Sequence, residues 1–267
     1  MPEALVTLNR VPGLISDEVR LATLKIVGLG TGGPGRLTAE AIIAMDNASR
    51  IYHLSPLGSE LITLYGDRVS SLEPLYAGPH TPEASYAGIV EFLVNEADSA
   101  QSRGQSICFA SYGDALFMVD STTALLSRLS TEKRFSVAVV PAVSAIGALR
   151  AMFPQELRGN FQCVDSNSIS TGLLMLNSAL PTIVTQVAEV GVRQLRAPVD
   201  DDALRRLTHA LATAYGPEHP CTLAVAPWYV DIPPLSIATT CGGLIECAPR
   251  IHTGMSLVIG ARVGLQA

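Results

Sequence analysis

Three short, mostly apolar runs that each end in a loop of small residues constrain the fold of this chain most. They are Leu24–Leu29 before Gly30, Ile107–Ala110 before Tyr112-Gly113-Asp114, and Phe135–Val140 before Pro141-Ala142-Val143-Ser144. Short runs of this kind are typical of strands that are buried on both faces of a sheet. The pattern therefore predicts one parallel sheet whose carboxyl edge forms a ligand crevice.

The sequence between these runs predicts alternating strands and helices, as in a doubly wound α/β fold. Thr38 is placed to cap a helix that follows the first strand. Further strands are expected at 50–54 and 69–75, a short helix at 59–65, and a long amphipathic helix at 83–104. We predict an N-terminal extension (1–23), a Rossmann-like, mostly parallel domain (24–141) and a mixed α/β C-terminal domain (142–267).

The C-terminal half has a different pattern of predicted strands and helices. Strands are expected at 182–187, 221–226, 236–240 and 255–259, whereas 154–169 reads as irregular. The acidic run Asp200-Asp201-Asp202 is expected to begin a helix that reaches about Tyr215, because acidic side chains suit a helix N-terminus. This half is therefore predicted to form a more antiparallel α+β unit.

Composition narrows the function classes. The 267 residues are 48% hydrophobic and 16% charged, with a formal net charge of −6 and no basic stripe, so a nucleic-acid partner is not expected. The apolar stretch 135–153 is interrupted by Pro141, Ser144 and Arg150, so no membrane span is expected. The five cysteines show no metal-like spacing, which indicates no metal site and a reduced, cytoplasmic setting.

The glycine-rich loop raises the question of a nicotinamide cofactor. Gly28-Leu29-Gly30-Thr31-Gly32-Gly33 matches the G-x-G-x-x-G pattern after a strand. That pattern needs an acidic residue at the end of the second strand to hold the ribose, and here the strand ends in Tyr52-His53-Leu54-Ser55. The sequence therefore argues against dinucleotide binding.

Taken together, the stretches GLGTGGPGRLTAEA, SYGDALF and VVPAVSAIGAL resemble the tetrapyrrole methylase superfamily of S-adenosylmethionine-dependent methyltransferases. The stretches VTQVAEVGV, ALRRLTHALATAYGPEHP and TGMSLVIGAR resemble its borosin-type branch, which methylates backbone amides of a peptide. The resemblance implies a two-domain fold, a homodimer, and S-adenosylmethionine as methyl donor with S-adenosylhomocysteine as product.

The resemblance also implies a cofactor pocket between the two domains. Its lining would come from two regions of this sequence: Tyr112, Asp114, Phe117, Ser144 and Ala145 in the first, and Gln186, Ala226, Ser256 and Leu257 in the second. The residues themselves allow two roles for Asp114. Its carboxylate suits hydrogen bonds from a ligand, and it equally suits stabilisation of the turn after Gly113.

Tyr76 and Tyr86 match two tyrosines that the borosin-type resemblance places at the methyl acceptor. An amide nitrogen needs activation, because its lone pair is delocalised into the carbonyl, and a phenol can act as base or oxyanion donor. Pro82 stands where that branch carries an arginine, and the sequence has no arginine between Arg68 and Arg103. The expected acceptor is a precursor peptide supplied in trans. A methyltransferase acting on a tetrapyrrole-like or other metabolite, and a non-catalytic partner protein, remain as alternatives.

Overall fold

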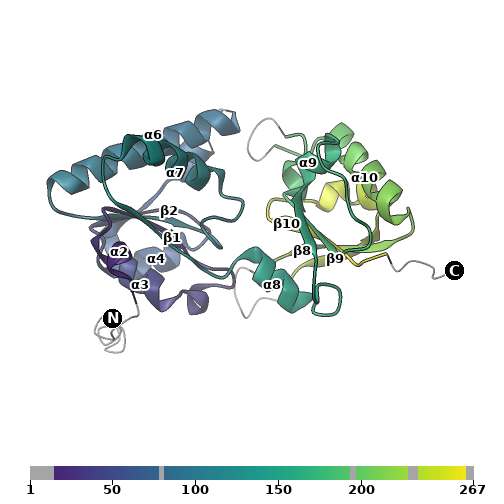
Figure 1. Ribbon diagram of the computed structural model, residues 1–267, viewed down its shortest axis with the longest axis horizontal. Coiled ribbons are helices and arrows are strands. Elements are labelled where there is room, and N and C mark those ends of the chain that lie inside the picture. The colour runs from purple at the N-terminus through teal and green to yellow at the C-terminus, as the bar shows by residue number, and fades with distance from the viewer. Residues whose placement is uncertain (1–14, 78–80, 193–196, 228–233, 263–267) are drawn as a thin grey trace. The chain divides into compact units, whose positions relative to one another are not determined.

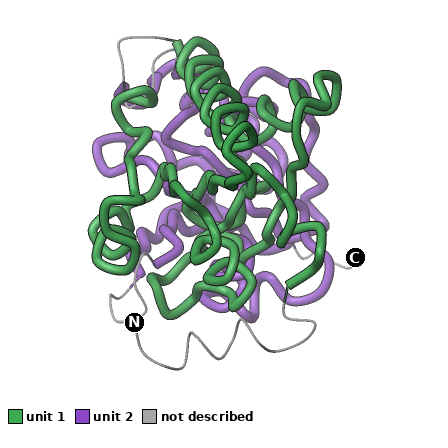
Figure 2. Tube along the Cα trace, turned by 90° about the vertical axis from the view of Figure 1, so that its left-hand side faces the viewer, with its two compact units in different colours: residues 1–145, 228–231 green, residues 146–227, 232–267 purple. Residues whose placement is uncertain are grey.

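The computed structural model describes residues 15–77, 81–192, 197–227 and 234–262, which form two compact units (Figure 2). Unit 1 covers the described residues up to Ala145, and unit 2 covers those from Ile146. The predicted boundary, between residues 141 and 142, falls in the loop between strand β5 (Val137–Val140) and helix α8 (Ala145–Met152). The two units divide four residues later, after Ala145.

Unit 1 is built on a five-stranded parallel sheet with the strand order β3-β2-β4-β1-β5. Strand β1 lies between β4 and β5, since Leu24 pairs with both Ile107 and Val137. The three loops singled out in the sequence therefore follow three adjacent strands, and the predicted parallel sheet is confirmed. The remaining bounds are β1 (Leu24–Gly28), β2 (Arg50–Leu54), β3 (Val69–Ser71) and β4 (Ile107–Ser111).

Helices cover both faces of this sheet (Figure 1). Along β4 successive side chains alternate, so that Cys108 packs in one apolar core and Phe109 in the other. The first core contains residues of α2 (Asp17–Leu21), α3 (Ala39–Asp46) and α4 (Gly58–Tyr65). The second contains residues of α6 (Pro82–Ser102) and α7 (Asp120–Glu132), with α5 (Glu73–Tyr76) packed beside it. Thr38 caps α3 as predicted, accepting a hydrogen bond from the Ala41 backbone at 3.1 Å.

Two local predictions for unit 1 need correction. The strand expected at 69–75 ends at Ser71, and α5 begins two residues later at Glu73. Pro74 in the first turn of α5 has no N–H for a sheet ladder, and its fixed φ suits a helix start. The segment 1–23 was predicted as an extension, but Ile15, Val19 and Ala22 are buried in the core of unit 1.

Unit 2 contains a mixed five-stranded sheet with the order β6-β7-β10-β8-β9. β6 (Gln162–Asp165) and β7 (Thr182–Thr185) are parallel, whereas β10 (Met255–Ile259), β8 (Pro220–Val225) and β9 (Ser236–Thr240) pair in antiparallel fashion. Helix α10 (Asp201–Tyr215) packs its apolar side into the core of this unit. The acidic run caps α10 as predicted, because Asp200 Oδ1 accepts from the Ala203 backbone at 2.7 Å.

The sequence-based prediction missed two elements in the stretch described as irregular. Strand β6 has four residues, of which Val164 alone is buried, and helix α9 (Ser166–Ser170) has five. Asp165 joins them, since its Oδ1 accepts from the Asn167 and Ser168 backbones at 2.8 and 3.2 Å. Elements this short carry too little hydrophobic periodicity to be recognised in sequence.

Candidate functional site

The carboxyl ends of β1, β4 and β5 are in direct contact. The Gly30 backbone N–H donates to the Gly113 carbonyl at 3.0 Å, and Gly113 returns a bond to Gly30 at 3.1 Å. A Cβ atom added to Gly28 would lie 2.6 Å from Ala142 Cβ and 2.8 Å from the Gly113 carbonyl oxygen. The glycine at position 28 is therefore required for the three strand ends to approach this closely.

Asp114 ties the ends of β4 and β5 together. Its Oδ1 accepts from the Leu116 backbone at 2.9 Å, and its Oδ2 accepts from the Ala142 backbone at 3.1 Å. The turn-stabilising role considered from the sequence is therefore present. Each carboxylate oxygen has further lone pairs, so the same side chain retains acceptor capacity for a ligand.

The other pocket residues expected in unit 1 lie in the same strand-end loops. Tyr112 is half-buried, and burial raises the pKa of its phenol to about 12, partly opposed by a hydrogen bond with the Gly32 backbone. Phe117 is half-buried and closes the turn, since its backbone N–H donates to the Asp114 carbonyl at 3.1 Å. Ser144 and Ala145, also half-buried, stand at the start of α8.

Buried polar atoms without a partner mark this edge as well, and sequence reasoning did not single them out. Within the described ranges, Thr31 Oγ1 and Ser111 Oγ make no hydrogen bond although the residues are 1% and 2% exposed. His53 Nδ1, near the end of β2, is likewise buried without a hydrogen-bond partner in the described structure. Burial lowers the pKa of His53, partly opposed by the charge of Glu73. Unpaired buried hydroxyls cost free energy, so each calls for a partner such as an ordered water or a bound ligand. The sequence offered one signal that could have identified these residues, namely that each stands at or just beyond the end of a strand.

The two predicted catalytic tyrosines lie side by side. Tyr76 ends α5 and Tyr86 stands in the first turns of α6, with ring centroids 6.2 Å apart and planes tilted by 43°. Both rings are half-buried. His80, which is close to both tyrosines in the sequence, lies outside the described residues. The structure thus brings Tyr76 and Tyr86 together at the end of the sheet where β3 leads into α5.

The pocket residues expected in unit 2 gather at one edge of its own sheet. Because β10 runs antiparallel to β7 and β8, the start of β10 meets the ends of those strands. Gln186 follows β7, Ala226 follows β8, and Ser256 is the second residue of β10. Gln186 has φ of 55°, which is unusual for a residue with a side chain, and its carbonyl accepts from Ser166 Oγ at 2.7 Å. Leu257 differs, because its side chain is buried in the apolar core of the unit.

In the described part of the chain, no group of three or more His, Cys, Asp or Glu side chains is arranged to hold a metal ion. Over the same residues, no helix has both the length and the apolar character that crossing a membrane demands. Cys108 and Cys221, which stand in apolar stretches of the sequence, are buried in apolar cores, whereas Cys163 in a similar stretch is only partly buried.

Comparison with known proteins decides the family. Residues 23–198, well over half of the chain, match the family model described as Tetrapyrrole (Corrin/Porphyrin) Methylases. The chain belongs to this family. Members use S-adenosylmethionine as methyl donor, so the assignment supports an S-adenosylmethionine-dependent methyltransferase that releases S-adenosylhomocysteine.

Solved structures agree with the fold of this methylase. A uroporphyrin-III C-methyltransferase from Thermus thermophilus matches with a TM-score of 0.61 at 20% identity, covering 91% of this chain and 94% of the other. The methyltransferase CobJ matches with a TM-score of 0.60 at 14% identity, covering 91% and 97%. These likenesses confirm the predicted two-domain α/β fold. No curated protein matched the sequence.

The strand ends of unit 1 fit part of such a donor molecule. Gly28 and Gly30 let the strand-end loops pack closely together, and Thr31 and Ser111 offer buried hydroxyls that need partners. An amine and ribose hydroxyls, as S-adenosylmethionine carries, would supply donors and acceptors to these groups and to Asp114. When bound, the sulfonium supplies an activated methyl group.

Proposed function

We propose that this methylase transfers the methyl group to a backbone amide nitrogen of a peptide that is a separate chain. The observation that carries the proposal is the Tyr76–Tyr86 pair, with ring centroids 6.2 Å apart at the end of the unit 1 sheet. The borosin-type resemblance of the sequence supports the same acceptor. In this reaction the S–CH₃ bond breaks, an N–CH₃ bond forms, and the amide N–H proton passes to a base.

A pair of phenols suits the most difficult step of this reaction, which is the loss of the amide proton. Loss of the amide proton builds negative charge on the peptide oxygen, because the nitrogen lone pair is conjugated with the carbonyl. One phenol can donate a hydrogen bond to that oxygen while the other relays the proton. We assign Tyr86 to the acceptor and Tyr76 to its support, since Tyr76 also packs against the apolar core that α6 covers.

The charge of the strand-end loops in unit 1 favours a neutral acceptor over a polycarboxylate. Across the described segments 29–38, 55–57, 72–77, 112–119 and 141–144, the charged side chains are Arg36, Glu73 and Asp114. Several cations would be needed to offset the many carboxylates of a porphyrinogen. One arginine and two acidic residues do not supply these cations. A peptide backbone is neutral and does not need them.

The test is intact-mass spectrometry of short peptides encoded beside the gene, each co-expressed with this chain. We expect a peptide that gains the mass of one or more methyl groups, with fragmentation placing them on backbone nitrogen. Tyr86→Phe should lower the methylation rate by about 10²-fold or more, because it removes an acid–base group. Tyr65→Phe, a buried tyrosine of α4, is the matched control and should leave the rate unchanged.

Three results would contradict the proposal or its mechanism and separate the alternatives. Methylation of a reduced tetrapyrrole with every peptide unmodified would assign the enzyme to metabolite chemistry. Binding of S-adenosylhomocysteine without methylation of either acceptor would assign the chain to the non-catalytic class. A Tyr86→Phe variant with wild-type turnover would remove the phenol from the mechanism.

A further inference from the structure

A second candidate binding region lies on unit 2. The C-terminal end of α9 and the middle of α10 border a surface cavity of about 500 Å³. Arg205, Arg206 and His209 of α10 line one side, and Ile169 and Thr171 line the other. All three basic side chains are exposed. The cavity therefore presents two guanidinium cations and an imidazole beside the apolar side chains of Ile169 and Ala210.

The two arginines have no acidic partner among the residues that the structure describes. The ion pairs found there are made by Arg128 and Arg134, both in unit 1. Asp201 and Asp202 stand one turn before the arginines on α10, yet neither comes within ion-pair distance of them. Their guanidinium groups thus keep five donors each for a carboxylate of another molecule.

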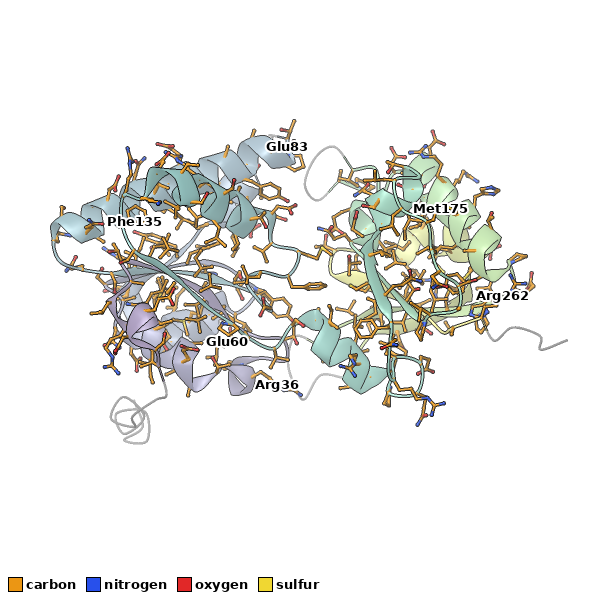
Figure 3. The ribbon with its side chains drawn as sticks, viewed as in Figure 1. Arg36, Glu60, Glu83, Phe135, Met175 and Arg262 are labelled. Atoms are coloured by element: carbon orange, nitrogen blue, oxygen red, sulfur yellow. The ribbon has the colours of Figure 1, made fainter. Side chains whose placement is uncertain are left out.

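An exposed apolar segment continues from the same cavity. Gly172, which also lines it, turns the chain with φ of 73°, and Leu173, Leu174 and Met175 follow. These three side chains are 82%, 38% and 93% exposed (Met175 is labelled in Figure 3). The segment is nevertheless held in place, because the Leu174 backbone donates to the Ser168 carbonyl at 3.0 Å and Leu176 packs on the core of unit 2. Consecutive exposed apolar side chains at a fixed position are typical of an interaction site.

We propose that this basic–apolar surface, defined by Arg205, Arg206, His209, Leu173 and Met175, binds an acidic amphipathic peptide segment of a partner protein. Carboxylates of the segment pair with the arginines, and its apolar side chains cover Leu173 and Met175. The exposed side chains of Leu173 and Met175 favour a peptide over RNA, because cations alone would be enough to bind an RNA backbone. The proposal stands whatever the methyl acceptor is.

The test uses a fluorescein-labelled synthetic helical peptide with Glu at i and i+4 and Leu at i+1 and i+5, titrated with the full chain and followed by fluorescence anisotropy. We expect saturable binding that weakens as salt is raised. Arg205→Glu/Arg206→Glu should weaken binding about tenfold or more, because attraction becomes repulsion. Arg20→Glu/Arg158→Glu changes the net charge equally at exposed arginines outside the cavity lining, and should leave binding unchanged. Leu173→Ser/Met175→Ser should weaken binding several-fold at high salt as well.

Three outcomes would overturn the assignment. The first is no binding of the peptide at low salt. The second is equal loss in both charge-reversal variants, which would reveal a net-charge effect. The third is tighter binding of a fluorescein-labelled single-stranded RNA than of the peptide. Because Leu173 and Met175 are almost fully exposed, their substitution leaves the fold intact and the result interpretable.

Discussion

Replacing Thr31 by Val separates ligand binding from folding at the strand ends of unit 1. Thr31 is 1% exposed, and its Oγ1 has no hydrogen-bond partner within the described ranges. Valine keeps the branched shape and removes only the hydroxyl. We therefore expect the protein without ligand to become more stable, and binding of S-adenosylhomocysteine to become weaker.

The magnitudes follow from the hydroxyl alone. A buried unsatisfied hydroxyl costs about 1–3 kcal/mol, so the free energy of unfolding should rise by up to that amount. For a chain of this length each kcal/mol corresponds to about 2–4 °C in Tm. A ligand hydrogen bond of about 0.5–1.5 kcal/mol lost on binding corresponds to an affinity about 2- to 13-fold lower.

Thermal unfolding and isothermal titration calorimetry of the same preparations measure both effects. Thr122→Val is the matched control, because Thr122 is fully buried on α7 and its Oγ1 is also unpaired in the described structure. It should gain stability while binding S-adenosylhomocysteine as the wild type does. A Thr31→Val protein that loses stability, or that binds the ligand with unchanged affinity, would refute the reasoning.

Two further predictions concern buried titratable groups. Burial lowers the pKa of His53, so the folded state resists its protonation. The free energy of unfolding should therefore fall as pH drops below the unfolded value of about 6.5, by at most about 1.4 kcal/mol per pH unit. We would measure the free energy of unfolding by urea denaturation at pH 7.5 and 5.5. Its change between the two pH values should be smaller for His53→Gln than for the wild type or for the exposed control His209→Gln. An equal change in all three proteins would contradict this prediction. Burial likewise lowers the pKa of Lys25, which is 1% exposed and donates from Nζ to Ser106 Oγ at 2.7 Å. Because the unfolded chain holds this proton up to about pH 10.4, Lys25→Met should raise the free energy of unfolding at pH 7 by on the order of 1 kcal/mol, and the gain should shrink toward pH 10. A loss of stability at pH 7 in the same denaturation experiment would show that the Ser106 bond outweighs the cost of burial.

The sequence predicted the elements whose signals are local. Strand β2 has the predicted bounds Arg50–Leu54, and α10 begins beside the acidic cap and ends at Tyr215 as expected. Both have a hydrophobic period or a capping residue that identifies them without the rest of the chain. Strand β6 has neither, and α9 has the cap at Asp165 but no hydrophobic period, so tertiary packing and the Asp165 bonds determine their order.

The site was predictable only in part, for a similar reason. The three strand-end loops could be placed at one edge, since parallel strands share a carboxyl edge. The unpaired atoms of Thr31, Ser111 and His53 could not be foreseen, because the absence of a partner depends on every neighbour in space. The link from Asp114 to Ala142 joins residues that are distant in sequence, and no local pattern encodes it.

Hydrogen–deuterium exchange with and without S-adenosylhomocysteine tests the central claim most directly. If the carboxyl edge of the unit 1 sheet holds the methyl donor, exchange should slow in the backbone of 29–33 and 111–116, which contain Thr31 and Asp114. Exchange at the far edge, such as in 104–106, should stay the same. Ligand binding with unchanged exchange in both strand-end segments would contradict the account.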